Sequence, residues 1–157
     1  MYKLGDKILY PMHGAGVIKQ ISKREILGEI KEYYIFTVPC GEMDVMIPVE
    51  GCDSIGVRPV VTPEEVYRAI EILGEESTEM TGNWNKRYRE NSEKIKSGNI
   101  ECVAEIVRNL TRIDRESKLS AGEKKMLSNA RKILQSEIML VLDMTREEAL
   151  EAIERAI

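Results

Sequence analysis

The sequence is poor in aromatic residues, cysteine and histidine, and each shortage excludes a class of protein. Aromatic residues make up 5% of the 157 positions, so the core must be mainly aliphatic. Cys40, Cys52 and Cys102 are widely separated, and His13 is the one histidine. This set excludes a disulfide framework and a structural zinc site. We therefore expect no metal or other cofactor, and we expect the cysteines to be small buried hydrophobic residues.

Long hydrophobic runs are also missing. No run approaches the ~18 apolar residues that can span a bilayer. The first residues, 1–6, lack the apolar stretch of a signal peptide. With 43% hydrophobic and 32% charged residues, the chain has the composition of a folded protein. These features predict a cytoplasmic location and one ordinary domain or two small ones.

The residues needed for catalysis are scarce as well. The segment from His13 to Gly16 is too short for a dinucleotide-binding loop and precedes a strand instead of a helix. A Ser or Cys nucleophile would have no histidine base other than His13. We expect His13 to be a turn residue whose ring makes a structural hydrogen bond, and we predict that the protein is not an enzyme.

Charge is strongly segregated along the chain, although the net charge is only −4. Residues 82–132 carry 13 Lys and Arg against 7 Asp and Glu, a net charge of +6. The flanking segments 59–81 and 133–157 have net charges of −5 and −4, and residues 1–58 have −1. A phosphate group senses the local field within a Debye length of about 8–10 Å. An anionic partner is therefore expected at residues 82–132.

The first third of the chain has the pattern of β-strands. Strands are predicted at residues 7–10, 17–21, 32–38 and 43–49, with a turn at 13–16 and a hairpin centred on Gly28. With the hairpin over residues 23–31 counted as the fifth, five short strands at this spacing predict a small antiparallel sheet or half-open barrel in residues 1–60. The edges of such a sheet recruit partners by strand addition unless charges blunt them. Both a blunted edge and a recognition edge are compatible with the charged residues Lys23, Arg24, Glu29 and Lys31.

Residues 61–157 have the pattern of helices. Four residues that favour helix N-caps precede apolar-periodic stretches, namely Thr62, Asn99, Ser120 and Thr145. A further helix is predicted at residues 84–96, and the polar residues 75–82 are expected to be a flexible linker. The fold class is therefore α+β, with an N-terminal β domain followed by a bundle of about five helices.

The stretch from Asn83 to Arg89 contains the single Trp, Trp84, together with three cations and a Tyr. An aromatic ring beside such cations can grip a nucleic acid backbone and wedge against a base. A lone Trp in a small domain is more often a core residue, so composition leaves both interpretations open.

Five basic residues from two predicted helices are candidates for DNA contacts: Lys86, Arg87, Arg89, Lys124 and Lys125. The sequence shows no recognition helix of the helix-turn-helix type. A sequence-tolerant contact with the backbone and minor groove fits better. The alternative is that each cation simply lies on a solvated helix face.

Seven stretches, in collinear order over nearly the whole chain, resemble the CarD/CdnL family of bacterial transcription regulators. They are residues 10–17, 28–34, 43–48, 84–91, 94–98, 103–110 and 119–124. The resemblance implies a Tudor-like N-terminal domain that binds the β subunit of RNA polymerase, and a helical domain, residues 61–157, that contacts promoter DNA. It also implies association with the nucleoid through the polymerase.

The resemblance further implies roles for single residues. Trp84 matches a Trp that wedges into the minor groove at the upstream edge of the transcription bubble and supports the open promoter complex. The basic residues beside that Trp in the family are matched here by Lys86, Arg87 and Arg89. We therefore expect the indole to be at least partly exposed at the head of its helix.

Arg24 matches a polymerase-contacting Arg. Met46 falls where some members have a second Arg, so this part of the contact is apolar here, and Lys23 completes the expected polymerase-binding set. A second hypothesis is a protein–protein adaptor whose sheet binds a partner and whose helices are only a scaffold, without direct DNA contact.

Overall fold

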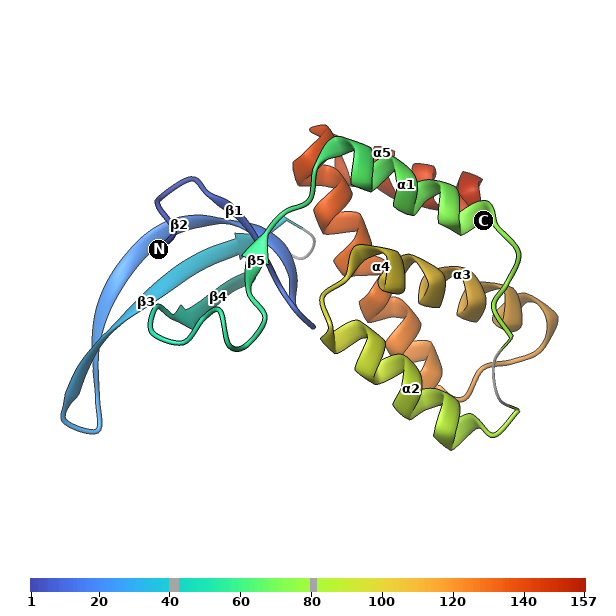
Figure 1. Cartoon of the computed structure of the whole chain (residues 1–157), viewed down its shortest axis with the longest axis horizontal. Coiled ribbons are helices and arrows are strands. Elements are labelled where there is room, and N and C mark those ends of the chain that lie inside the picture. The colour runs from blue at the N-terminus through green and yellow to red at the C-terminus, as the bar shows by residue number, and fades with distance from the viewer. Residues whose placement is uncertain (40–42, 80–81) are drawn as a thin grey trace.

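The computed structural model describes residues 1–39, 43–79 and 82–157. A sheet comes first and a helical bundle follows (Figure 1). The strands are β1 (Lys7–Tyr10), β2 (Gly14–Ile26), β3 (Glu29–Val38), β4 (Met43–Pro48) and β5 (Arg58–Pro59). The helices are α1 (Pro63–Gly74), α2 (Trp84–Lys96), α3 (Ile100–Glu116), α4 (Ala121–Leu142) and α5 (Arg146–Ala156). The predicted α+β class, with five helices in the second part, is confirmed.

The five strands form one antiparallel sheet in the order β4-β3-β2-β1-β5. The end strands β4 and β5 do not pair with each other, so the sheet is open, as the half-open barrel prediction requires. Its strands are less uniform than predicted, because β2 runs for 13 residues and β3 for 10. Alternate side chains of β3 line one face and build the core of the sheet, with Tyr34 and Phe36 fully buried.

The outer halves of β2 and β3 form a projecting hairpin (Figure 1). Its two turn residues, Leu27 and Gly28, have φ values of 52° and 80°. Positive φ at both positions is the geometry that matches the right-handed twist of a hairpin. The predicted hairpin at Gly28 is confirmed. Because β4 pairs with β3 only as far as Tyr33, the ribbon beyond that residue extends past the rest of the sheet.

The turn predicted at residues 13–16 was wrong, because Gly14 to Gly16 already belong to β2. The turn lies earlier, where the backbone NH of His13 donates to the carbonyl of Tyr10 over 3.0 Å. Gly16 is needed inside the strand, since a Cβ there would collide with the carbonyl of Thr37 and the ring of Phe36. A close approach between β2 and β3, and not a turn, therefore explains this glycine.

The helices begin where the capping residues predict. Thr62, Asn99, Ser120 and Thr145 each accept a backbone NH from the first turn of the helix that follows. Asn83 does the same for α2 and accepts from the amides of residues 85 and 86. In the described residues, no helix is both long and apolar enough to cross a membrane.

The segment after α1 is not the free linker that its composition predicted. Arg108 and Arg112 of α3 reach back to it. Arg108 donates to the hydroxyl of Thr78 over 2.8 Å, and Arg112 donates to the carbonyl of Glu75 over 2.7 Å. Residues 75–79 are therefore bound along α3. The remainder of the predicted linker includes residues 80–81, which lie outside the described residues.

The sheet and the bundle are joined along α4. Leu9 and Ala15 of the sheet belong to the helical core, and the NH of Ala15 donates to the hydroxyl of the buried Ser136 over 2.9 Å. A Cβ at Gly14 would lie 2.9 Å from that hydroxyl oxygen, so the strand can approach α4 only without a side chain there. This close packing places the sheet at a defined position on the bundle.

Candidate nucleic-acid interface

Trp84 is the first residue of α2, and its side chain is 51% exposed. The cap made by Asn83 sets the start of the helix and therefore the direction in which the indole leaves it. Tyr88 lies one turn further along α2 and is 38% exposed. The expectation that Trp84 lies partly exposed at the head of its helix is confirmed. An exposed indole provides a flat apolar face and one hydrogen-bond donor.

The predicted cations of α2 fall into two groups. Lys86 and Arg89 are exposed, and no ion pair is formed by either among the described residues. Arg87 is different, because its Nε and Nη2 donate to both carboxylate oxygens of Glu123 over 2.7 and 2.8 Å. The charge of Arg87 is thus largely neutralised inside the protein, whereas those of Lys86 and Arg89 face solvent.

The pair between Arg87 and Glu123 is almost removed from water. The two side chains are 16% and 1% exposed. The bond from Arg87 is the main reason that the pKa of Glu123 is lowered, and the bond to Glu123 raises the pKa of Arg87. This ion pair joins the first turn of α2 to the first turn of α4, and it holds the turn that carries Trp84 against the bundle.

Lys124 and Lys125 follow Glu123 on α4 and are both exposed. Successive residues of a helix point about 100° apart, so Lys124 and Lys125 lie on different surfaces of α4. Lys125 lines a hollow of about 490 Å³ together with Tyr88 of α2 and Lys132 of α4. Lys124 lines a second hollow between α3, α4 and α5. The structure therefore brings Lys125 beside α2 and turns Lys124 toward the other side of α4.

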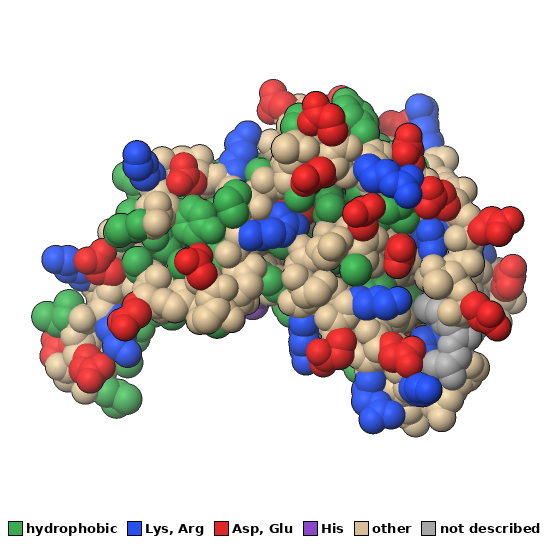
Figure 2. Space-filling model, viewed as in Figure 1, with side chains coloured by type: hydrophobic (Ala, Val, Ile, Leu, Met, Phe, Trp, Pro, Cys, Tyr) green, Lys and Arg blue, Asp and Glu red, His purple; other side chains and the backbone are tan. Residues whose placement is uncertain are grey.

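Figure 2 shows several Lys and Arg side chains at the lower edge of the bundle, where α2 lies, with Asp and Glu side chains among them. Sequence reasoning missed Glu123 as a partner of Arg87 and Lys132 as a neighbour of Lys125. The spacing of Lys125, Asn129 and Lys132 by four and three residues was a signal that could have found the second.

The residues predicted to bind polymerase lie on the sheet. Arg24 of β2 is opposite Lys31 of β3, and Met46 of β4 is opposite Ile35 of β3. Residues 31 and 35 lie on the same face of β3, because side chains alternate with a period of two. Arg24 and Met46 therefore share one face. Lys23 is opposite Glu32 and lies on the other face.

Apolar side chains are exposed at the hairpin tip and on both faces of the outer strands. Leu27 at the hairpin tip is 99% exposed and Ile30 is 72% exposed, while Met43 and Met46 of the edge strand β4 are 58% and 44% exposed. Figure 2 shows hydrophobic side chains at the end of the hairpin.

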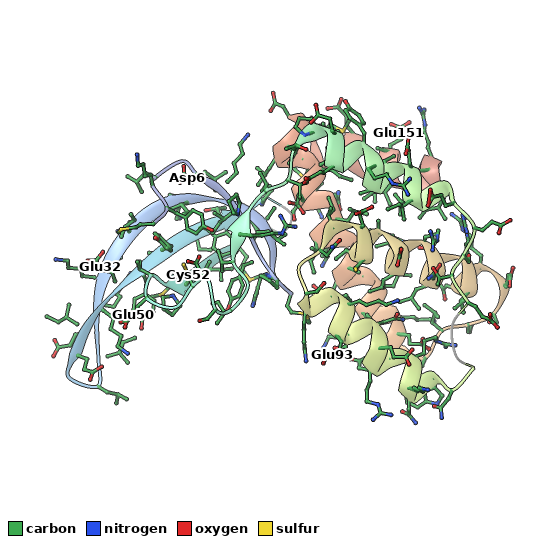
Figure 3. All side chains as sticks on the ribbon, viewed as in Figure 1. Asp6, Glu32, Glu50, Cys52, Glu93 and Glu151 are labelled. Atoms are coloured by element: carbon green, nitrogen blue, oxygen red, sulfur yellow. The ribbon has the colours of Figure 1, made fainter. Side chains whose placement is uncertain are left out.

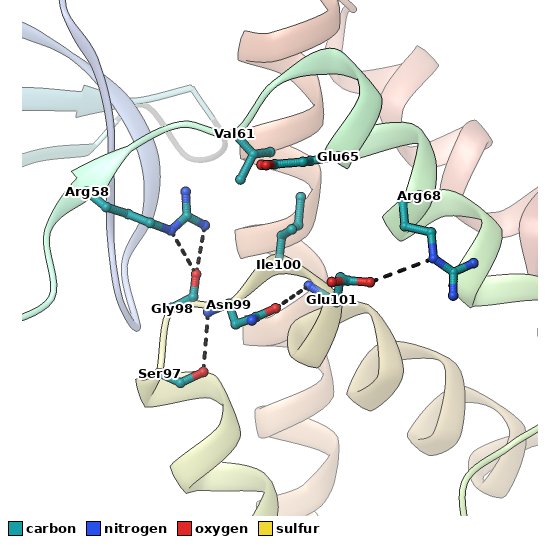
Figure 4. A pocket seen from close by; sticks show the side chains of 9 residues that line it. All are labelled: Arg58, Val61, Glu65, Arg68, Ser97, Gly98, Asn99, Ile100 and Glu101. Atoms are coloured by element: carbon teal, nitrogen blue, oxygen red, sulfur yellow. Dashed lines mark hydrogen bonds and ion pairs between the residues drawn. The ribbon is translucent and has the colours of Figure 1, made fainter.

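At the cleft between the sheet and the bundle, hydrogen bonds and an ion pair hold the two parts together. Arg58 donates to the carbonyl of Gly98 over 2.7 and 3.0 Å (Figure 4). It also donates to both oxygens of Glu137 over 2.8 and 3.0 Å. The carboxylate of Glu137, only 2% exposed, accepts the backbone NH of Val61 as well. The guanidinium in this cleft of about 390 Å³ is already bound by the protein.

Groups that could support catalysis are dispersed. His13 is exposed, and its ring lies 4.4 Å from that of Tyr10. Cys52 is buried, which raises the pKa of its thiol, while Cys40 lies outside the described residues. Figure 3 shows Glu93 and Glu151 on separate helices. Among residues 1–39, 43–79 and 82–157, no three His, Cys, Asp or Glu side chains lie close enough together to hold a metal ion.

Comparison with known proteins gives two family matches that together cover most of the chain. Residues 2–61 match the CarD-like/TRCF RID domain, and residues 68–154 match the family described as CarD, C-terminal domain. The chain is also 38% identical over 148 residues to a protein of Bacillus subtilis (strain 168) named "Putative transcription factor YdeB". That match covers 94% of this chain and 97% of the relative.

Proposed function

The chain belongs to the CarD/CdnL family of transcription regulators, and on this premise we propose that it is tethered to RNA polymerase and stabilises the open promoter complex. The sheet binds the β subunit of the polymerase. The bundle, residues 61–157, contacts promoter DNA, and Trp84 wedges into the minor groove at the edge of the transcription bubble.

The observation that carries this proposal is the position of Trp84. The indole is 51% exposed at the first residue of a capped helix. It therefore contributes less to the stability of the fold than a buried indole would. Lys86 and Arg89 lie on the same short helix with their charges facing solvent. The ion pair between Arg87 and Glu123 fixes this turn, so little ordering is required when the indole meets DNA.

The sheet supports the other half of the proposal. Arg24, Met46 and the exposed Ile26 share one face, and the exposed Leu27 lies beyond Ile26 at the hairpin tip. A protein surface with a complementary acidic and apolar patch would cover both. Tethering through the sheet raises the effective concentration of the bundle at the promoter, so a modest basic surface is sufficient for DNA contact.

A Trp wedge favours the open complex only because its affinity for unstacked DNA exceeds its affinity for a closed duplex. Trp84 can enter DNA whose bases are unstacked, but it has little to gain from a closed duplex. A ligand shifts an equilibrium only toward the state that it binds better. The protein therefore lengthens the lifetime of the open complex.

The test is the lifetime of the open complex formed by polymerase with the full chain. Trp84→Ala should shorten this lifetime and leave the affinity for polymerase unchanged. Tyr67→Ala is a matched control, because Tyr67 is 57% exposed on α1. An unchanged lifetime with Trp84→Ala in a folded variant would favour the adaptor function without DNA contact. Arg24→Ala should weaken polymerase binding in either case.

A further inference from the structure

A second group of cations lies on the side of the bundle reached by Lys124. A hollow of about 380 Å³ opens there between α3, α4 and the start of α5. Four basic side chains line it, and the only carboxylate among its lining residues is Asp114. The four are Lys124, Arg131, Lys132 and Arg146. Apart from Lys124, none belongs to the surface assigned to DNA by sequence.

Among the described residues, these four cations form no ion pairs. They differ in this from Arg58 and Arg87, each of which has both oxygens of a carboxylate as partners. Arg131 is half-buried, yet among the described residues its Nη2 donates only to the hydroxyl of Thr111 over 3.3 Å. Its Nε is buried and has no hydrogen-bond partner in the described part of the chain.

The other three side chains reinforce this excess of positive charge. Within residues 1–39, 43–79 and 82–157, no ion pair is formed by Lys124, Lys132 or Arg146. Asp114 contributes one negative charge against these four positive charges, and it accepts the backbone NH of Leu119 over 3.4 Å. A half-buried positive charge without a counter-charge costs free energy, and an anion bound in the hollow would offset that cost.

The shape of the site selects the anion. Lys124, Arg131 and Gln135 follow one face of α4 at intervals of seven and four residues, a length of about 16 Å at 1.5 Å per residue. A single carboxylate would engage only part of this row. Two arginines and two lysines suit phosphate oxygens, which arginine binds through two parallel hydrogen bonds.

We propose that this hollow is a binding site for consecutive phosphate groups. Two sources have that chemistry, the backbone of DNA and a free oligophosphate such as the phosphate chain of a nucleotide. Binding here needs neither the Trp84 wedge nor polymerase. If DNA is the source, Lys132, which lines both this hollow and the one beside α2, connects the two sides of α4, and the protein holds the duplex on both sides of that helix.

The site can be tested with the isolated full chain labelled with ¹⁵N. Inorganic tripolyphosphate is titrated in one arm and a duplex DNA in the other, while backbone amide shifts are recorded. We expect saturable shifts at Arg131, Gln135 and Arg146, which line this hollow and not the one beside α2. Arg131→Gln with Arg146→Gln should weaken the binding that produces them at least about tenfold, because two charge-assisted contacts are lost.

The matched control is Lys118→Gln with Arg155→Gln, which removes the same charge from two exposed positions outside the hollow. Should Arg131→Gln disturb the fold, Lys132→Gln with Arg146→Gln provides a second variant. Site-specific shifts with tripolyphosphate alone identify a free oligophosphate, and shifts with DNA alone identify the DNA backbone. An equal loss in the control, or no shift at these amides with either probe, overturns the proposal. Trp84→Ala leaves the tripolyphosphate shifts intact, which separates this test from that of the wedge.

Discussion

Arg87 and Glu123 form a bidentate ion pair, with Nε and Nη2 lying 2.7 and 2.8 Å from the two carboxylate oxygens. The two residues are 36 positions apart and lie in the first turns of α2 and α4. Glu123 also accepts the hydroxyl hydrogen of Ser120, the cap of α4. One carboxylate therefore participates both in starting α4 and in holding the helix that carries Trp84.

Removing one member of this pair should lower the free energy of unfolding more than removing both members. Arg87→Met leaves the carboxylate of Glu123 buried without its partner, and we expect a loss of about 3 kcal/mol in the free energy of unfolding. Adding Glu123→Leu should recover most of that loss, because no uncompensated charge remains. Urea denaturation of the two single variants and the double variant measures the coupling. Additive losses would show that the pair contributes nothing as a unit.

The same pair should make stability depend on pH in the acid range. Hydrogen bonds from Arg87 lower the pKa of Glu123 below its ordinary value of 4.5. The stabilisation is therefore fully present above pH 4.5 and is lost as the pH falls through the lowered pKa of the folded state. Glu123→Gln should remove this contribution. Urea denaturation between pH 7 and pH 3 should show a smaller loss of stability in the variant than in the parent protein.

The contact between Arg58 and Glu137 should couple the sheet to the bundle. Arg58→Gln leaves the carboxylate of Glu137 buried, and the NH of Val61 is then its one remaining hydrogen-bond donor among the described residues. We expect calorimetry to resolve two unfolding transitions where the parent protein has one, because the two parts no longer support each other. Arg68→Gln is the control, since that side chain is 48% exposed and exposed ion pairs contribute little to stability. A single transition in Arg58→Gln would show that the apolar contacts of α4 suffice.

Gly16 should be the glycine of the sheet that tolerates change least. In Gly16→Ala the new Cβ meets the backbone of Thr37 and the ring of Phe36, neither of which can move without disrupting β3. We expect a loss of about 3 kcal/mol or more. Gly82→Ala is a matched substitution with no atom within 4 Å of the added Cβ, and it should change stability little. Thermal unfolding followed by circular dichroism compares the two.

The dependence of DNA binding on salt should identify the cations that face the backbone. Lys86→Gln with Arg89→Gln should reduce the slope of log K against log salt concentration by about two, one for each lost phosphate contact. Lys118→Gln with Arg155→Gln should leave the slope unchanged. Fluorescence anisotropy with a labelled duplex measures the affinity at each salt concentration. If Lys86→Gln with Arg89→Gln leaves the slope unchanged, α2 is not part of the DNA-binding surface.

Much of the fold was predictable because its signals are local. Thr62, Asn83, Asn99, Ser120 and Thr145 cap amides only two or three residues away. The hairpin at Gly28 is equally local. The turn at residues 13–16 was predicted wrongly because glycine in a turn and glycine at a close approach have the same sequence pattern. Gly16 is required by Phe36 and Thr37, which lie about twenty residues further along.

The candidate site was predictable only in part. Composition located Trp84 among cations, and the family resemblance predicted its exposure, which the structure confirms. Neither could distinguish Arg87 from Arg89, because the two residues share a type and a helix. Their difference depends on which face of α2 meets the start of α4.

The sequence by itself determined where the helices begin, where positive charge gathers and which aromatic residue heads α2. These properties depend on residues within a few positions of one another. Only the tertiary structure decided that Arg87 is neutralised by Glu123, that Arg24 and Lys23 lie on opposite faces of the sheet, and that Lys124 meets Arg131 and Arg146 in one hollow. Burial and pairing of charge depend on elements far apart in the chain, so they are settled only when those elements pack.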